Sequence, residues 1–304
     1  MNIATPQRGG TAVITGAASG FGLEASRIAA ARGMNVVMAD VQADALEAAA
    51  AEIAALGAPV LPLRVDVSKA AEVDALGAAT LQRFGAPRFV FNNAGVGAGG
   101  LIWEHSAQDW EWVLGVNVMG VVHGVRVFTP MMLAAAASDP GWQGHIVNTA
   151  SMAGLLNAPN MGVYNVSKHA VVSLSETLHQ DLALVSTQVH AHVLCPYFVP
   201  TGIHQRERNR PAAADVAAPA PTRSQRIAQA MVEQAVTRGK VTAAQVADFV
   251  FEAMDANRFY IYSHPQSLAG VQVRLEDIMT PRNPSDPFAA RPEIGQQLRA
   301  SLKP

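Results

Sequence analysis

The sequence predicts an α/β protein with a doubly wound, seven-stranded parallel β-sheet. The first observation is that short runs rich in Val, Ile and Phe alternate with longer Ala-rich stretches as far as Tyr262. The second is that these short runs are apolar throughout, which is typical of strands buried on both faces of a parallel sheet. Right-handed crossovers through the intervening helices then wind the sheet in both directions.

The expected elements follow one another in strand–helix order. The predicted strands are Thr11–Thr15, Asn35–Ala39, Val60–Val65, Arg88–Phe91, His145–Thr149, Val189–Leu194 and Phe259–Tyr262. The predicted helices are residues 20–32, 42–56, 69–84, 106–136, 161–185, 224–238, 242–257 and 291–302. Because no internal repeat and no sharp change of composition occurs before residue 200, residues 1–304 are expected to form a single, Rossmann-like α/β domain.

Two segments depart from this alternation. Residues 200–240 begin with a polar, Arg-rich stretch, continue through an Ala/Pro run and end in a helix. A long segment interrupted by proline predicts a mobile lid. Residues 263–304 form a C-terminal extension with several prolines. This extension is expected to cover a substrate cleft, pack on a neighbouring subunit or remain loose, and the sequence does not choose between these.

The composition narrows the classes of function. Half of the 304 residues are hydrophobic and 15% are charged, which provides a large core and indicates that part of the surface is covered by another subunit. The net charge of −2 provides no basic surface for nucleic acid, and one cysteine cannot close an intramolecular disulfide. The N-terminal sequence lacks the apolar region of a signal peptide, and no apolar run reaches the roughly 18 residues of a membrane span. We therefore expect a cytoplasmic protein with no membrane partner.

A glycine-rich turn follows the first predicted strand. The sequence Thr15–Gly22 reads T-G-A-A-S-G-F-G and leads into a helix, whose positive end can hold a pyrophosphate. Asp40 ends the next strand, 18 residues after Gly22, where its carboxylate would accept hydrogen bonds from both adenosine-ribose hydroxyls. Its charge would repel a 2′-phosphate, so the pattern favours NAD over NADP. The alternatives are a glycine-rich turn without a ligand and an Asp40 that caps the following helix.

The glycine pattern and several motifs further along resemble the short-chain dehydrogenase/reductase family, in its single-domain branch. The resemblance spans residues 10–202. Its motifs are Asp66-Val67, Asn92-Asn93-Ala94-Gly95, Asn117 within V-N-V-M-G, Ser151, and the Y-x-x-x-K element from Tyr164 to Lys168. This family implies a catalytic set of Asn117, Ser151, Tyr164 and Lys168. The cofactor-binding residues so implied, together with those of the glycine-rich turn, are Gly16, Ser19, Gly20, Phe21, Gly22, Asp40, Asp66, Val67, Asn93, Ala94, Gly95, Tyr164, Lys168, Val199 and Thr201.

The chemistry of the Y-x-x-x-K element follows from the residues themselves. Tyr164 and Lys168 are four residues apart and share one face of a helix. A neighbouring ammonium and a positive nicotinamide ring favour the phenolate and are expected to lower the pKa of Tyr164, which can then exchange a proton with an alcohol or ketone. Lys168 can also hold the nicotinamide ribose, and Ser151 can donate to the substrate oxygen. The family resemblance further implies that Asn117 holds a water connecting Lys168 to solvent.

The expected substrate pocket is apolar and offers no fixed charge. Its candidate residues are Val96, Met152, Leu155, Leu156, Met161, Tyr197, Phe198 and Ile203. The family resemblance implies an NAD-dependent oxidoreductase that transfers a hydride between the cofactor and its substrate. The apolar pocket residues indicate that this substrate is a neutral, hydrophobic secondary alcohol or ketone. Tyr197 departs from the family, which usually has glycine there, and so leaves the identity of the substrate open.

Two alternative functions remain at this point. A ketoacyl-thioester reductase could grip a phosphate with Arg206, Arg208 and Arg210. A non-catalytic nucleotide-binding regulator could also keep this fold, although the intact catalytic set argues against it. His190 and His192 alternate on one strand, but no carboxylate or cysteine completes a ligand set, so we predict no metal.

Overall fold

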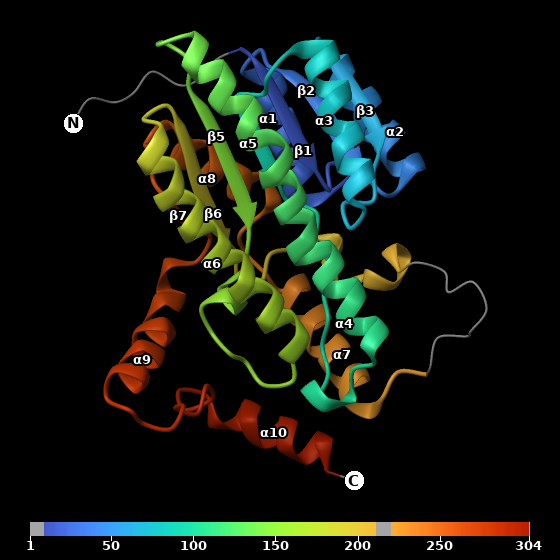
Figure 1. The fold of residues 1–304 in the computed structure, drawn as a ribbon. Coiled ribbons are helices and arrows are strands. Elements are labelled where there is room, and N and C mark those ends of the chain that lie inside the picture. The colour runs from blue at the N-terminus through green and yellow to red at the C-terminus, as the bar shows by residue number, and fades with distance from the viewer. Residues whose placement is uncertain (1–8, 211–219, 304) are drawn as a thin grey trace.

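Seven parallel strands form the centre of the molecule, as the sequence predicts. The computed structural model describes residues 9–210 and 220–303. The strand order is β3-β2-β1-β4-β5-β6-β7, so the chain reverses its winding direction between β1 and β4 (Figure 1). In sheets of this kind, ligands bind at the carboxyl ends of the strands beside such a reversal. The strands are β1 Thr11–Thr15, β2 Asn35–Asp40, β3 Val60–Arg64, β4 Phe89–Asn92, β5 Gly144–Thr149, β6 Val189–Cys195 and β7 Tyr260–Tyr262.

Helices cover both faces of the sheet (Figure 1). One face packs on α1, α2 and α8, with Ile53 and Phe251 fully buried there, and the other packs on α3, α5 and α6, around Leu76 and Phe128. The sheet is therefore buried on both faces, which explains its continuous apolar strands. The helices are α1 Gly20–Ala31, α2 Ala43–Ala55, α3 Ala70–Phe84, α4 Ala107–Leu114, α5 Gly120–Ser138, α6 Gly162–Val185, α7 Arg223–Thr237, α8 Ala243–Asp255, α9 Leu268–Met279 and α10 Pro292–Leu302.

The predicted helix at residues 106–136 is a long rod with an irregular turn inside it. Residues Gly115–Met119 form a π-helical turn between α4 and α5, and Asn117 lies in this turn. Such turns occur frequently at functional sites. By length and composition the rod from Ala107 to Ser138 could cross a membrane. Its apolar composition is also explained by packing, because Phe128 and Met132 are buried against the sheet.

The C-terminal extension is more helical than the sequence predicts. The expected helix near residues 291–302 is present as α10, whereas α9 is a further helix in a segment for which the sequence predicts none. Leu268 of α9 packs against the cluster around Met152. At the far end, Arg223 of α7 donates a hydrogen bond to the carbonyl of Lys303. The extension thus runs from the end of β7 back to α7 (Figure 1).

The predicted lid is described only in part. Its helix is present as α7, whose N-terminus is capped by Thr222 through a capping box with Gln225. Residues 211–219 lie outside the described part of the chain. Mobility of the lid stays a prediction.

Candidate active site

The turn between β1 and α1 leaves an open cradle at the helix N-terminus. Gly16 has φ +64°, a conformation that side chains disfavour. A Cβ on Gly22 would lie 2.2 Å from the carbonyl oxygen of Gly16, so only glycine permits this close approach. Ser19, at the N-cap position of α1, makes no side-chain capping bond. Glycines that let the backbone approach closely and an uncapped helix N-terminus fit the diphosphate of a dinucleotide.

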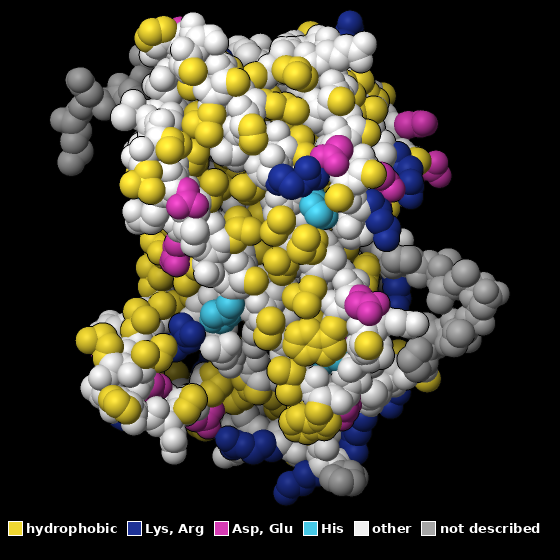
Figure 2. Space-filling model, in the orientation of Figure 1, with side chains coloured by type: hydrophobic (Ala, Val, Ile, Leu, Met, Phe, Trp, Pro, Cys, Tyr) yellow, Lys and Arg dark blue, Asp and Glu magenta, His cyan; other side chains and the backbone are white. Residues whose placement is uncertain are grey.

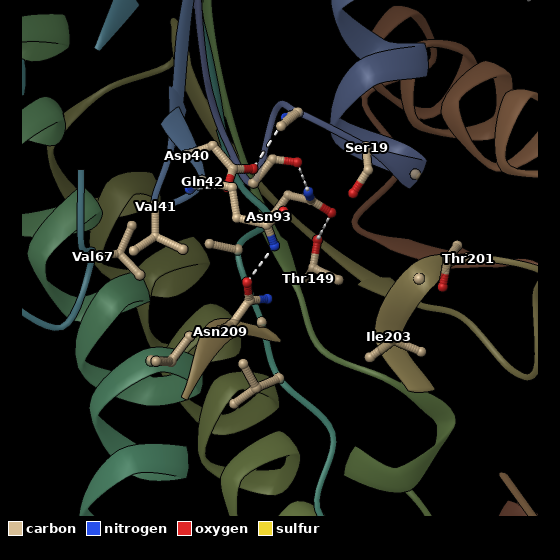
Figure 3. A pocket seen from close by; sticks show the side chains of 18 of the residues that line it. Ser19, Asp40, Val41, Gln42, Val67, Asn93, Thr149, Thr201, Ile203 and Asn209 are labelled. Carbon is tan, nitrogen blue, oxygen red and sulfur yellow. Dashed lines mark hydrogen bonds between the residues drawn. The ribbon is translucent and has the colours of Figure 1, made fainter. Parts of the chain in front are cut away.

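Asp40 lies at the end of β2, beside this turn (Figure 3). Its Oδ2 accepts a hydrogen bond from the N–H of Ala18 at 3.0 Å, and its Oδ1 accepts one from the N–H of Gln42 at 3.0 Å. A carboxylate has about four acceptor positions, so two remain for ribose hydroxyls. The alternative that Asp40 caps the next helix is wrong, since Gln42 is the N-cap residue of α2.

Asn93 connects the carboxyl ends of three strands. The hydroxyl of Thr15 on β1 accepts hydrogen bonds from the N–H groups of Asn93 and Ala94, at 2.9 and 3.1 Å. The Asn93 Nδ2 donates to the carbonyl of Thr15 at 3.0 Å, and its Oδ1 accepts from Thr149 on β5 at 3.4 Å (Figure 3). Asn93 therefore holds together the edge of the sheet on which a cofactor would lie.

Asn117 has no exposed surface and positions the loop after β4. Its Oδ1 accepts from the N–H of Val96 at 2.8 Å, while its Nδ2 donates to the carbonyl of Val96 at 3.0 Å and to Ser167 on α6 at 3.1 Å. Its side chain thus joins the β4 loop to α6. The water-holding role implied by the family stays a prediction.

Ser151, Tyr164 and Lys168 converge where β5 ends against α6. The Ser151 hydroxyl donates to the carbonyl of Pro196 at 3.2 Å and also hydrogen-bonds with Tyr164. The Lys168 Nζ donates to the carbonyl of Thr149 at 2.8 Å and lies 5.7 Å from the centroid of the Tyr164 ring. The structure therefore brings three of the four predicted catalytic residues together directly, and Asn117 braces α6 beside them.

Burial moves both titratable groups of this cluster toward their neutral forms. It lowers the pKa of Lys168 to about 8, so at neutral pH the ammonium form still predominates. Burial also raises the pKa of Tyr164, and the hydrogen bond with Ser151 opposes that rise only in part. The expected lowering of the tyrosine pKa includes the effect of a bound nicotinamide ring and stays a prediction. A positive ring bound beside the phenol would have to supply it.

A cavity of about 420 Å³ opens at the carboxyl ends of β1, β2 and β4. Most of the predicted cofactor residues line it: Gly16, Ser19, Gly20, Phe21, Asp40, Asp66, Val67, Asn93, Ala94, Gly95, Tyr164, Lys168 and Thr201. Gly22 and Val199 do not, because Gly22 packs on Gly16 and the Val199 side chain lies in the core beneath α1. Only the backbone of Val199 could meet a cofactor.

The eight predicted substrate residues are divided among different surroundings. Val96 and Ile203 line the cavity, and Met161 packs in the same cluster as Val96 and Tyr164. Tyr197 is 41% exposed, and its ring contacts those of Phe198 at 4.7 Å and His264 at 5.8 Å between centroids. The remaining three pack together beside α9: Met152, Leu155 and Leu156. These three lie on a loop that packs against the C-terminal extension, and a substrate pocket formed by all eight residues stays a prediction.

The sequence does not predict the contacts that hold residues 209 and 210 at the cavity. The Gln42 side-chain amide donates to Asn209 (Figure 3), and Arg210 forms a 2.7 Å ion pair with Asp109 while lying 5.3 Å from the Trp112 ring centroid. The Arg-rich run after Thr201 is a sequence signal for such contacts, but the run does not identify their partner residues. Arg210 is thus engaged within the protein, not free to grip a phosphate as the thioester alternative supposed.

Known proteins share the sequence pattern of this chain. A family model described as short chain dehydrogenase matches residues 10–212. The chain belongs to this family. Over 88% of its length it is 35% identical to the CLA biosynthesis dehydrogenase/reductase of Lactiplantibacillus plantarum, of which 92% is covered. It is 34% identical, again over 88% of its length, to the 1-deoxy-11-beta-hydroxypentalenate dehydrogenase of Streptomyces avermitilis, of which 87% is covered.

Among solved structures, this short-chain dehydrogenase is similar to one from Burkholderia phymatum in complex with NAD. The two are 52% identical with a TM-score of 0.89, over 94% of this chain and 99% of the other. The family and the doubly wound fold predicted from sequence are both confirmed. Among residues 9–210 and 220–303, no three His, Cys, Asp or Glu side chains gather as metal ligands.

Proposed function

We propose that this short-chain dehydrogenase uses NAD to interconvert a neutral, hydrophobic secondary alcohol and the corresponding ketone. The observation that carries the proposal is the buried Tyr164, hydrogen-bonded with Ser151 and followed one helical turn later by Lys168, at the wall of the cavity. The family supports oxidoreductase chemistry, and a relative named a hydroxypentalenate dehydrogenase supports an alcohol as one partner of the reaction.

The residues of the chain divide the acid–base work. A nicotinamide dinucleotide, when bound, supplies the redox chemistry by accepting or returning a hydride. Tyr164 takes the proton from the alcohol hydroxyl in the oxidative direction and returns it to the carbonyl oxygen in the reductive one. Ser151 donates to the same oxygen and stabilises the negative charge that develops there. Lys168 lowers the cost of the phenolate through its positive charge, which its pKa of about 8 preserves at neutral pH.

The preference for NAD rests on Asp40. Asp40 lines the cavity, and both of its carboxylate oxygens accept backbone N–H groups, which fixes the carboxylate in place. A fixed negative charge at the ribose position attracts hydroxyl donors and repels a 2′-phosphate. The NAD complex of the Burkholderia phymatum relative supports the same cofactor.

The preference for a neutral substrate rests on the residues near Tyr164. Val96 and Met161 pack in the same apolar cluster as Tyr164, and neither can hold a carboxylate or phosphate. The pairing of Arg210 with Asp109 also weakens the case for a phosphate-bearing thioester substrate. Tyr197 and Phe198 offer aromatic surface near the end of β6, where an aryl ring could stack.

A spectrophotometric screen tests this proposal. Aliphatic, aryl and steroid-like secondary alcohols are offered with NAD and NADP in parallel, and reduced nicotinamide is followed by its absorbance. We expect turnover with hydrophobic alcohols and NAD, and little with acidic or phosphorylated ones. Absence of turnover with every alcohol and ketone would instead support the non-catalytic regulator.

A homodimer or homotetramer belongs to the same proposal, as do a small-molecule substrate and a cytoplasmic location. Figure 2 shows hydrophobic side chains gathered over α4 and α5. Met119 in the π-helical turn is 40% exposed, and Val166 on α6 is 44% exposed. Apolar surface on two long helices is typical of subunit contacts. Light scattering at micromolar concentration should give a particle of at least twice 32.0 kDa, and a monomer would contradict the proposal.

A further inference from the structure

Residues 201–210 cross the mouth of the cavity and are fixed at both ends. At one end Thr201 lies against the glycine-rich turn, since its methyl group is 3.5 Å from where a Cβ on Gly20 would be. At the other end Asn209 accepts the hydrogen bond from Gln42. Figure 3 shows Thr201 near Ser19 on one side of the cavity, with Asn209 and Gln42 on the opposite side. We call residues 201–210 the crossing segment.

Arg208 lies between these two attachments. Its Nη2 is 2.6 Å from where a Cβ on Gly202 would be, so the guanidinium rests against the bare backbone of the residue that follows Thr201. Arg208 also lines the cavity. Within the part of the chain that the structure describes, its guanidinium has no ion-pair or hydrogen-bond partner, whereas Arg210, two residues on, is paired with Asp109.

Charged side chains of both signs line the cavity. The carboxylates of Asp40 and Asp66, with Arg64 at the end of β3, line the part next to β2 and β3, where a ribose and an adenine would lie. Arg208 lies instead next to Gly202, whose neighbour Thr201 touches the first turn of α1. The positive end of α1 favours a diphosphate, and Arg208 adds a cation to the wall of the same cavity.

We propose that Arg208 is a cofactor-binding residue that pairs with the diphosphate of the dinucleotide. This rests on the proposed use of a nicotinamide dinucleotide by the same cavity. A guanidinium offers several N–H donors in a fixed planar arrangement that matches two phosphate oxygens at once. The N–H groups of α1 and Arg208 would then hold the diphosphate together, and the crossing segment would close on the cofactor through this contact.

Binding measurements with cofactor fragments test the proposal without any need for turnover. The dissociation constants of NAD, ADP and adenosine are compared for the wild type and for Arg208→Gln, with adenosine measured by competition against NADH fluorescence. We expect NAD and ADP to bind about tenfold or more weakly to the variant and adenosine to bind unchanged, because only the first two carry a diphosphate. Arg208→Lys should recover part of the loss.

Arg64→Gln is the matched control, because Arg64 lines the same cavity at the end of β3 and its side chain is 59% exposed. If Arg208 acts only by adding positive charge to the cavity, the two variants will weaken ADP equally, which would overturn the proposal. The salt dependence of NAD binding gives a second readout, and it should be shallower for Arg208→Gln than for the wild type.

Other binding results would also test the assignment of Arg208 to the diphosphate. An equal loss for adenosine and ADP would show that Arg208 merely holds the crossing segment in place. A loss confined to adenosine 2′-monophosphate would assign it to a 2′-phosphate instead. Unchanged binding of ADP would overturn the proposal outright. If the wild type binds neither NAD nor ADP, the proposed function itself fails, and this result is distinct from all the others.

Discussion

Two regions of this short-chain dehydrogenase meet at the cavity, and they are held in different ways. The floor comprises residues 9–195 and 240–262, which include the seven strands, α6 and α8. The cover comprises residues 196–210, 220–239 and 263–303. In the floor, the glycine-rich turn and the Tyr164–Lys168 pair depend on neighbours within a few residues along the chain. In the cover, the attachments join distant residues, since Asn209 reaches Gln42 and Arg210 reaches Asp109.

This difference indicates a division of labour. The floor carries the proposed catalytic and cofactor-binding residues on buried, hydrogen-bonded groups of a two-sided core, so its substitutions should change rate or stability strongly. The cover consists of loops and amphipathic helices with partly exposed contacts, so its substitutions should change specificity and do so modestly. The measurements below test this difference between the floor and the cover.

The largest effect is expected from Tyr164→Phe in the floor. The substitution removes the only atom of this residue that can exchange a proton and leaves its ring packing in place. General acid–base groups contribute typically 10²- to 10⁴-fold, so kcat should fall by about that factor. Steady-state kinetics measure the rate, and NAD titration serves as the control because cofactor affinity should be nearly unchanged. A variant that keeps more than about a tenth of wild-type kcat would contradict the role of Tyr164.

The next effect concerns two buried histidines on adjacent strands of the floor. The Nδ1 of His145 lies 2.9 Å from the Nε2 of His192, whose own Nδ1 donates to the carbonyl of Arg258 at 2.8 Å. Neutral rings can form this whole chain of hydrogen bonds, and their burial disfavours a charge on either ring. Burial lowers the pKa of His192 to about 4 and that of His145 to about 2, against a usual 6.5.

Stability should therefore fall as the pH drops below 6.5. Over that range the unfolded chain takes up protons that the folded protein refuses, and the loss continues until the pH reaches the folded-state values. Between pH 7 and 5 the free energy of unfolding should decrease by on the order of 2 kcal/mol per buried imidazole. Urea unfolding measures this, and NMR should show two imidazoles still neutral at pH 5. A flat stability profile with both rings protonated at pH 5 would refute the argument.

A smaller effect is expected at Asp40. The wild type should prefer NAD by at least about tenfold in kcat/KM, which corresponds to about 1.4 kcal/mol. Asp40→Asn removes the charge and keeps an oxygen that can accept one of the two backbone N–H groups. The variant should therefore fold normally while its preference for NAD narrows. Kinetics with both cofactors measure the ratio, and equal turnover of NADP by the wild type would exclude this role for Asp40.

The smallest effect is expected from the cover. Tyr197→Gly removes an aromatic ring that contacts Phe198 and His264 and is 41% exposed. Loss of aromatic stacking is worth about 0.5–1.5 kcal/mol, so kcat/KM for aryl alcohols should fall a few-fold. Short aliphatic alcohols, which cannot stack, should be affected less and serve as the comparison. Equal losses for both classes would mean that Tyr197 shapes only the backbone beside the cofactor.

Much of the floor could be predicted from sequence because short-range rules determine it. The seven strands, the glycine-rich turn and the helical spacing of Tyr164 and Lys168 each reflect what a few consecutive residues can do with their backbone and side chains. Asn117 could be selected by its motif. Its hydrogen bonds to Val96 and Ser167 could not be predicted, since they depend on where α6 lies.

The sequence by itself therefore determined the strand–helix order, the family and the residue types proposed for the catalytic centre. Only the tertiary structure decided how the cavity closes, because Gln42 meets Asn209 and Arg210 meets Asp109 across long stretches of chain that carry no local pattern for those pairs. It also decided that α9 forms and that burial raises the pKa of Tyr164. The physical reason is common to all of these: burial and long-range contact depend on the packed arrangement of the whole chain, whereas turns and periodicity depend on neighbours in sequence.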